Sequence, residues 1–141
     1  IYCFLGASLM SNQEESFVVD GVSPDGKWLC VFEDDGETGY LYFCPLSSDG
    51  EMIGIADALW IYNQISPSIF ECEKVDIIWS EDSMKSILIV DGECWGIFDL
   101  LSKRKLNAPR HNNIIVSISL KIWEEGIPSN LGEPLNFNVQ N

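Results

Sequence analysis

Five short apolar or aromatic runs, each bounded by Asp, Gly, Ser or Pro, restrict this chain to a mainly β fold. Runs of this length rich in Val, Ile, Phe, Tyr and Trp are typical of strands. The predicted strands cover residues 28–32, 40–44, 75–79, 86–90 and 94–98. Asp-Gly turns at 35–36 and 91–92 separate two pairs of these runs, and Asp-Gly readily supplies the positive φ of a tight hairpin. The sequence therefore predicts two hairpin units.

Two further segments complete the predicted sheet. Residues 114–122 alternate apolar and polar side chains over most of their length, which predicts a half-buried antiparallel strand. Residues 56–63 could form two helical turns or a strand, and their Trp, Ile and Tyr favour a strand. The expected architecture is a single-domain antiparallel sheet, either an open sandwich or a curled sheet, with little helix.

A short motif recurs along the chain. Ser-Pro-Asp-Gly at 23–26 precedes a strand, a turn and an aromatic strand, and Ser-Glu-Asp-Ser at 80–83 does the same 57 positions later. The first motif resembles a β-propeller blade, but a propeller needs about four or more blades. A chain of 141 residues has room for two such units, so its length excludes a propeller.

The 141 residues fit one domain. We expect an N-terminal segment over residues 1–16, a β core over 17–125 and an irregular tail over 126–141. The apolar opening of ten residues lacks a basic region and is shorter than the ~20 residues of a membrane span, so it favours neither a signal peptide nor an anchor. Residues 100–113, with four basic side chains and His111, are expected to form an exposed loop.

The net charge of −14 is unevenly placed, with −16 in residues 1–99 and +2 in residues 100–141. Such a field repels the phosphates of nucleic acids and anionic lipids, so we expect no nucleic-acid or membrane-surface binding. A basic protein partner would be attracted, although many domains carry acidic charge only for solubility. Five cysteines without a CxxC pair favour reduced core thiols, hence a cytoplasmic protein, while one disulfide stays an alternative.

The stretch Glu-Asp-Asp-Gly-Glu-Thr-Gly-Tyr at 33–40 is the main candidate site. It is interpreted as a solvated hairpin turn, as a recognition edge for a basic partner, or as a divalent-metal site. The candidate binding residues are Glu33, Asp34, Asp35, Glu37, Thr38 and Tyr40. Any metal would be held by Asp34, Asp35 and Glu37. Tyr42 and Tyr62 are added as surface aromatics, because a hydroxyl keeps one end of the ring wet.

This stretch, with the motif at 23–26 before it and Asp-Ala-Leu-Trp-Ile-Tyr-Asn at 57–63 after it, resembles a bacterial family of uncharacterised small domains known only as a domain of unknown function. Residues 79–82 and 97–99 fit the same pattern, so the resemblance covers about 17–100. It implies a family and no activity.

Catalysis finds little support in the sequence. The chain has one histidine, His111, in a polar loop where a solvated side chain is expected, and it has no GxSxG, P-loop or HExxH motif. No catalytic residue and no cofactor are expected, although paired carboxylates of a hydrolase stay an alternative. Core packing is the usual role of tryptophans within strands, and four of the five lie there.

The sequence best supports a small acidic protein-binding domain, such as an inhibitor, an immunity-type protein or an adaptor. A divalent-metal-binding or metal-assisted hydrolase domain is the first alternative. A small-ligand-binding β-domain with an aromatic cavity is the second.

Overall fold

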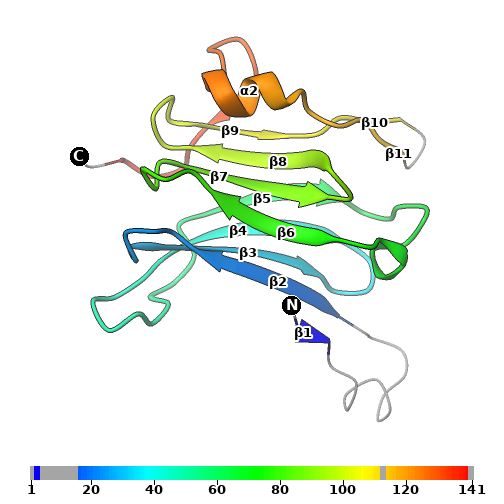
Figure 1. Cartoon of the computed structure of the whole chain (residues 1–141), viewed down its shortest axis with the longest axis horizontal. Helices are drawn as coiled ribbons and strands as arrows, with labels where there is room; N and C mark the ends of the chain where they lie inside the picture. The colour runs from blue at the N-terminus through cyan, green and yellow to red at the C-terminus, as the bar shows by residue number, and fades with distance from the viewer. Residues whose placement is uncertain (1, 4–15, 112–113, 140–141) are drawn as a thin grey trace.

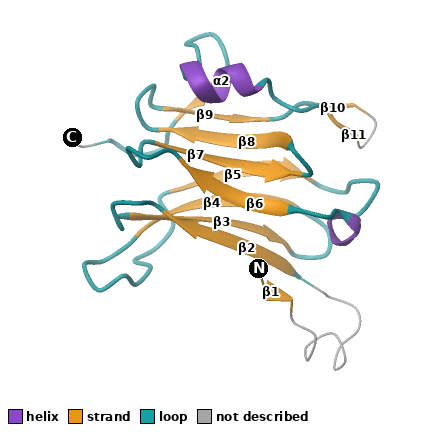
Figure 2. Cartoon of the chain, viewed as in Figure 1, coloured by secondary structure: helices purple, strands orange, loops and turns teal. Residues whose placement is uncertain are grey.

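The computed structural model describes residues 2–3, 16–111 and 114–139 and shows two antiparallel sheets facing each other (Figure 1, Figure 2). The prediction of a mainly β, open architecture with little helix is confirmed. The N-terminal segment expected over 1–16 lies mostly outside the described residues. No helix among those described has the length and apolar character that crossing a membrane requires.

The first sheet is a meander in which each strand pairs with its neighbour along the chain. Its strands are β1 (Tyr2–Cys3), β2 (Phe17–Val22), β3 (Trp28–Asp34), β4 (Gly39–Pro45) and β5 (Asp57–Tyr62). The ambiguous segment at 56–63 is therefore a strand. The predicted hairpin around the Asp-Gly turn at 35–36 is the β3–β4 pair.

The second sheet repeats the meander and adds one short strand at its far edge, in the order β12-β9-β8-β7-β6. Its strands are β6 (Val75–Trp79), β7 (Lys85–Val90), β8 (Glu93–Asp99), β9 (Arg104–Asn107) and β12 (Glu133–Pro134). Outside both sheets lie the 3₁₀ turn η1 (Ile69–Glu71), the hairpin of β10 (Arg110–His111) with β11 (Ile114–Ile115), and the helix α2 (Leu120–Glu125).

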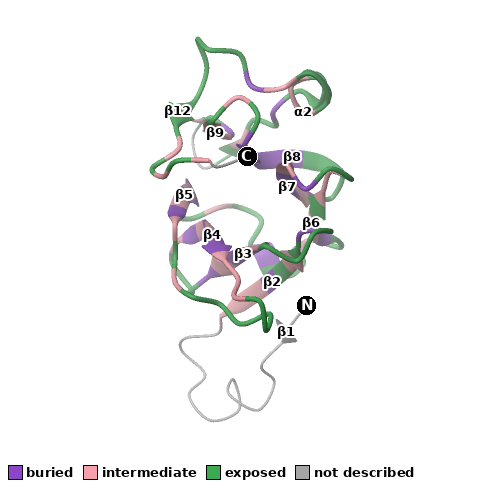
Figure 3. Cartoon of the chain, turned by 90° about the vertical axis from the view of Figure 1, so that its left-hand side faces the viewer, coloured by how far each residue is buried: buried purple, intermediate pink, exposed green. Residues whose placement is uncertain are grey.

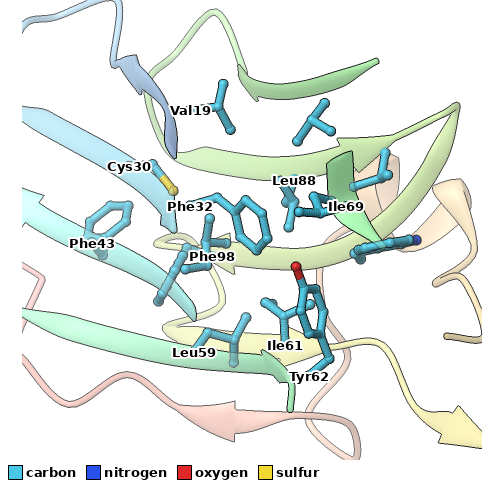
Figure 4. Packing of buried hydrophobic residues seen from close by; sticks show 14 of the residues in the cluster. Val19, Cys30, Phe32, Phe43, Leu59, Ile61, Tyr62, Ile69, Leu88 and Phe98 are labelled. Carbon is cyan, nitrogen blue, oxygen red and sulfur yellow. The ribbon is translucent and has the colours of Figure 1, made fainter. Parts of the chain in front are cut away.

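The core fills the space between the two sheets (Figure 3, Figure 4). Strand β2 lies beside β6 and β5 beside β9, so the two sheets approach each other along both edges. In β4, Leu41 and Phe43 point inward and are fully buried, while Tyr40 and Tyr42 alternate outward. Phe43 contacts the ring of Phe98 from the opposite sheet, with centroids 4.9 Å apart. Aromatic pairs of this kind add about 0.5–1.5 kcal/mol beyond their buried area.

The motif repeated at a spacing of 57 residues builds the same turn in both sheets. Ser23 Oγ accepts a hydrogen bond from the N–H of Trp28, and Ser80 Oγ accepts one from the N–H of Lys85. Both hydroxyls also donate to the aspartate two residues ahead. The two turns touch, because the N–H of Asp25 donates to Ser83 Oγ over 2.9 Å. The repeat is therefore structural and joins the sheets at one end.

Strand β2 was not predicted, because Asp20-Gly21 interrupts its apolar run in the manner of a turn. Gly21 instead permits a close approach of the second sheet. A Cβ at this position would lie 3.1 Å from Ile77 Cγ2, and the Trp79 indole N–H donates to the Gly21 carbonyl over 2.9 Å. The spacing of the repeat was the missed signal, because β6 shifted back by 57 residues falls on β2.

The strand predicted over 114–122 is wrong. This segment holds β11, a single bridge between Ile118 and Cys94, and the first residues of α2. The edges of β8 are already paired with β7 and β9, so little pairing is left for the segment. Ser119 caps α2 by accepting from the N–H of Lys121, a typical helix start. Of the expected apolar face, Ile118 is buried and Ile114 is 60% exposed.

The exposed loop predicted over 100–113 is also wrong, since it contains β9 and β10. Polar and basic side chains of this segment bridge to β5 of the first sheet, and we call this junction the seam. Lys105 and Asn107 donate to the carbonyls of Ala58 and Trp60 in β5, at 3.1 and 2.8 Å, and Arg110 donates to the carbonyl of Ile61. The edge of β5 is thus satisfied by side chains rather than by another strand.

The tail after residue 126 is more regular than predicted. β12 pairs with β9, and Phe137 stacks on Phe43 with ring centroids 5.7 Å apart. Asn136 donates to both oxygens of Asp57 through its backbone and side-chain nitrogens. Asp57 also forms a buried ion pair of 2.6 Å with Lys105. These contacts fasten the tail to the seam.

Candidate binding surface

The acidic turn is a hairpin loop in which two of the four carboxylates are used internally. Asp35 Oδ1 accepts from the N–H groups of Glu37 and Thr38, at 3.0 and 2.9 Å. The hydrogen bonds from these two N–H groups, led by that of Thr38, lower the pKa of Asp35 below its usual value of 3.8. Asp34 turns inward, and its Oδ1 accepts from the N–H of Gly36 at 2.7 Å. The turn chemistry of the sequence explains this conformation.

Tyr62 was predicted to lie on the surface, but the structure buries it. It is 1% exposed, and its hydroxyl donates to Asp34 Oδ2 over 2.6 Å. Burial and this hydrogen bond raise the pKa of Tyr62 well above its usual value. The ring packs against Gly39, where an added Cβ would come within 2.6 Å of Tyr62 Cζ. A glycine at the start of β4 therefore makes room for the ring, and Asp34 is withdrawn from any external ligand.

Glu33 and Glu37 carry the outward charge of the turn. Glu37 is exposed and Glu33 is half-buried on the outer side of β3. Among the residues described, neither glutamate forms an ion pair. Asp35 is exposed as well, although its own turn holds its carboxylate, so Glu33, Asp35 and Glu37 all contribute negative charge to the surface.

An aromatic row continues from this acidic turn across the outer side of the first sheet. The register places Tyr40 between Glu33 on β3 and Trp60 on β5. Tyr42 lies two residues along β4, and its ring stacks on that of Tyr40 with centroids 5.8 Å apart. Burial, followed by the negative charge of Glu33, raises the pKa of Tyr42. We call this surface the outer face; it consists of Val18, Asp20, Val31, Glu33, Tyr40, Tyr42, Ala58 and Trp60.

Arg110 ends the row. Its guanidinium lies over the Trp60 ring, 3.6 Å from the centroid, and burial lowers its pKa. Core packing is expected for Trp60 and an exposed loop for Arg110 from the sequence alone, so neither residue was predicted to belong to this surface. The register of β4 and β5 places Trp60 beside Tyr40, and the alternation in β5 could have indicated its outward direction.

The metal interpretation loses its geometric basis. Asp34 is turned toward Tyr62 and Asp35 is held by its own turn, so Asp34, Asp35 and Glu37 do not converge. In the described part of the chain, no group of three or more His, Cys, Asp or Glu side chains is arranged to hold a metal ion.

Thr38 completes the turn by donating its hydroxyl to Asp35. His111 is exposed on β10.

A family model described as an uncharacterized protein conserved in bacteria, DUF2251, matches residues 11–125. The chain belongs to this family. The DUF2251 match includes the whole acidic turn and the outer face, and it extends beyond residue 100, where the resemblance seen in the sequence ended.

One relative of this DUF2251 chain is an uncharacterized protein of Haemophilus influenzae strain Rd. It is 37% identical over 70 residues, which are 49% of this chain and 42% of that relative. The chain thus spans less than half of the relative's length. No solved structure matches the chain.

Proposed function

We propose that this DUF2251 protein is a protein-binding domain whose outer face and acidic turn bind a basic partner. The observation that carries the proposal is the continuous row Glu33, Tyr40 and Trp60, with Tyr42 stacked beside it. Tyr, Trp and Arg are the residues most enriched at interface hot spots. The rigid rings of Tyr and Trp bury a large area at a low entropy cost.

The charges support a basic partner in particular. Glu33, Asp35 and Glu37 lie beside the aromatic row. Their negative charge has the same sign as the net charge of the chain, which is −14. Carboxylates at the edge of an interface chiefly speed the encounter and select the partner's sign, while the aromatic centre supplies most of the affinity. An inhibitor or adaptor that covers a basic surface would use this division of roles.

Affinity capture from a lysate of the source organism, with three versions of the full chain as bait, tests this proposal. The first is the wild type, the second is a face variant with Glu33→Lys and Glu37→Lys, and the third is a control with Glu124→Lys and Glu125→Lys on α2. Both variants change the net charge equally, and none of the four glutamates is buried. The captured proteins are quantified by mass spectrometry at low and high salt.

The proposal predicts a basic protein that the wild type and the control capture at low salt and that the face variant loses. High salt should release it from the wild type and the control, because the screening length falls from about 8 Å at physiological ionic strength to about 3 Å at 1 M. Capture of the same proteins by the face variant and the control would contradict the proposal.

A further inference from the structure

A pocket of about 280 Å³ opens at the end of the sandwich that carries the acidic turn. The connection between β5 and β6, the β7–β8 hairpin and β11 enclose it. Ile65, Val90, Trp95 and Ile115 line it with apolar side chains. The exposed Asp91 and Glu93 also line it, and we call them the rim carboxylates. The volume falls just below the ~300–1,000 Å³ of typical small-molecule sites, so it suits one side chain rather than a larger ligand.

Tyr62 connects this pocket to the acidic turn. Its hydroxyl bonds Asp34, and its ring meets that of Trp95 edge to face, with centroids 6.1 Å apart. Tyr62 therefore lies between the turn and Trp95 of the pocket lining. The pocket and the turn lie at the same end of the two sheets, as the arrangement of the β3–β4 and β7–β8 turns in Figure 1 also shows.

The charged side chains that line the pocket are acidic. Cys72 also lines the pocket. Burial is the largest cause that raises the pKa of its thiol, and the negative charges of Asp91, Glu71 and Glu93 raise it further. No lysine or arginine of the described residues lines the pocket. An anionic ligand would be repelled here, while a cation would gain from both rim carboxylates.

Each rim carboxylate uses one oxygen inside the protein. Asp91 Oδ1 accepts from the N–H groups of Glu73 and Lys74, at 2.9 and 2.8 Å. Glu93 Oε1 accepts from the Trp95 indole N–H at 3.4 Å. In the described part of the chain, no donor bonds the second oxygen of either group. Two carboxylates are thus held in place with one oxygen each available to a ligand.

We propose that this pocket receives an arginine side chain of the bound partner. The guanidinium donates to Asp91 and Glu93, and the aliphatic stem lies across the pocket against Ile65, Trp95 and Ile115. Arginine suits the site better than lysine, because its planar group presents several donors and can bond two carboxylates at once. This inference rests on the proposed function and specifies how the partner is anchored.

The test uses N-acetyl-arginine amide as the probe and the neutral N-acetyl-citrulline amide as its control. The full chain is labelled with ¹⁵N, and the indole N–H signals are assigned with Trp95→Phe and Trp60→Phe. A fragment of this size should bind with a dissociation constant on the order of 1–10 mM. We expect a saturable shift of the Trp95 signal with the arginine probe and none with citrulline.

Glu93→Gln provides the matched variant, since Glu93 is exposed and the substitution keeps its shape while removing its charge. Glu93→Gln should lower the affinity for the arginine probe at least about fivefold, while Glu124→Gln on α2 should leave this affinity unchanged. The inference is overturned if citrulline shifts the Trp95 signal equally, if no saturable shift occurs, or if Glu93→Gln binds as the wild type does.

The two proposals fail in different ways. If the probe saturates the pocket but the face variant still captures the same proteins, the pocket stands and the outer face is wrong. If the face variant loses its partner but the probe does not bind, the outer face stands and the arginine anchor is wrong.

Discussion

The hydroxyl of Tyr62 donates a 2.6 Å hydrogen bond to Asp34 Oδ2, which joins the acidic turn to the aromatic core. The two residues are 28 positions apart, on β5 and at the end of β3. Asp34 is 8% exposed, so its carboxylate depends on this hydroxyl and on the Gly36 N–H for its hydrogen bonds. The conformation of the turn is thereby fixed by the core.

Tyr62→Phe should lower the free energy of unfolding by about 1–3 kcal/mol, because it leaves a buried carboxylate oxygen without its donor. Urea denaturation measures the change. Tyr40→Phe is the control, since its half-buried hydroxyl forms no side-chain bond among the described residues, and it should change stability by less than about 0.5 kcal/mol. Equal effects of the two substitutions would show that the Tyr62 bond carries no stability.

The buried pair Asp57–Lys105 gives a larger expected effect. Lys105→Ala leaves a fully buried carboxylate facing the amides of Asn136, and breaking a buried pair in this way costs about 3–5 kcal/mol. Lys121→Ala removes an exposed pair with Glu125 and should cost less than about 0.5 kcal/mol. Denaturation of both variants tests the seam, and a loss below 1 kcal/mol for Lys105→Ala would contradict its role.

The repeated turns predict a pH dependence. The Ser80 hydroxyl and the Met84 N–H lower the pKa of Asp82 below its usual value of 3.8. A lowered pKa in the folded state stabilises the protein above the unfolded value, and this stability is lost as the pH falls through the folded value. The stability difference between wild type and Asp82→Asn should therefore be present at pH 6 and shrink below about pH 4. A difference that stays constant to pH 3 would contradict the assignment.

The cysteines should differ in reactivity. Burial raises the pKa of Cys30 and of Cys94 to about 12, so neither forms appreciable thiolate at pH 8. Iodoacetamide followed by peptide mapping should label the half-buried Cys72 before Cys30 and Cys94, which should react only after denaturation. Rapid labelling of Cys30 in the native protein would show that the first sheet opens.

Much of this fold was predictable from local signals. The Asp-Gly turns and the aromatic runs on either side of them define the β3–β4 and β7–β8 hairpins, because turn type and strand propensity act over a few residues. The missed elements depend on distant contacts. Gly21 resembles a turn residue until Trp79 is seen bonding its carbonyl, and the basic residues of 100–113 resemble a solvated loop until the open edge of β5 is known.

The candidate surface was predicted in part for the same reason. The acidic turn was evident from its composition, whereas Asp34 and Tyr62 were removed from it by a contact across 28 residues. Trp60 and Arg110 join it only through strand pairing and the seam. Propensity predicts the parts of this surface, and sheet register decides which of them face outward.

The measurement that tests the outer face most directly is the affinity of the captured basic protein for the Glu33→Lys and Glu37→Lys variant at several salt concentrations. Binding should be at least about tenfold weaker than for the α2 control, with a shallower dependence on salt, because two charges of the interface have been reversed. Affinity and salt dependence equal to those of the control would contradict it.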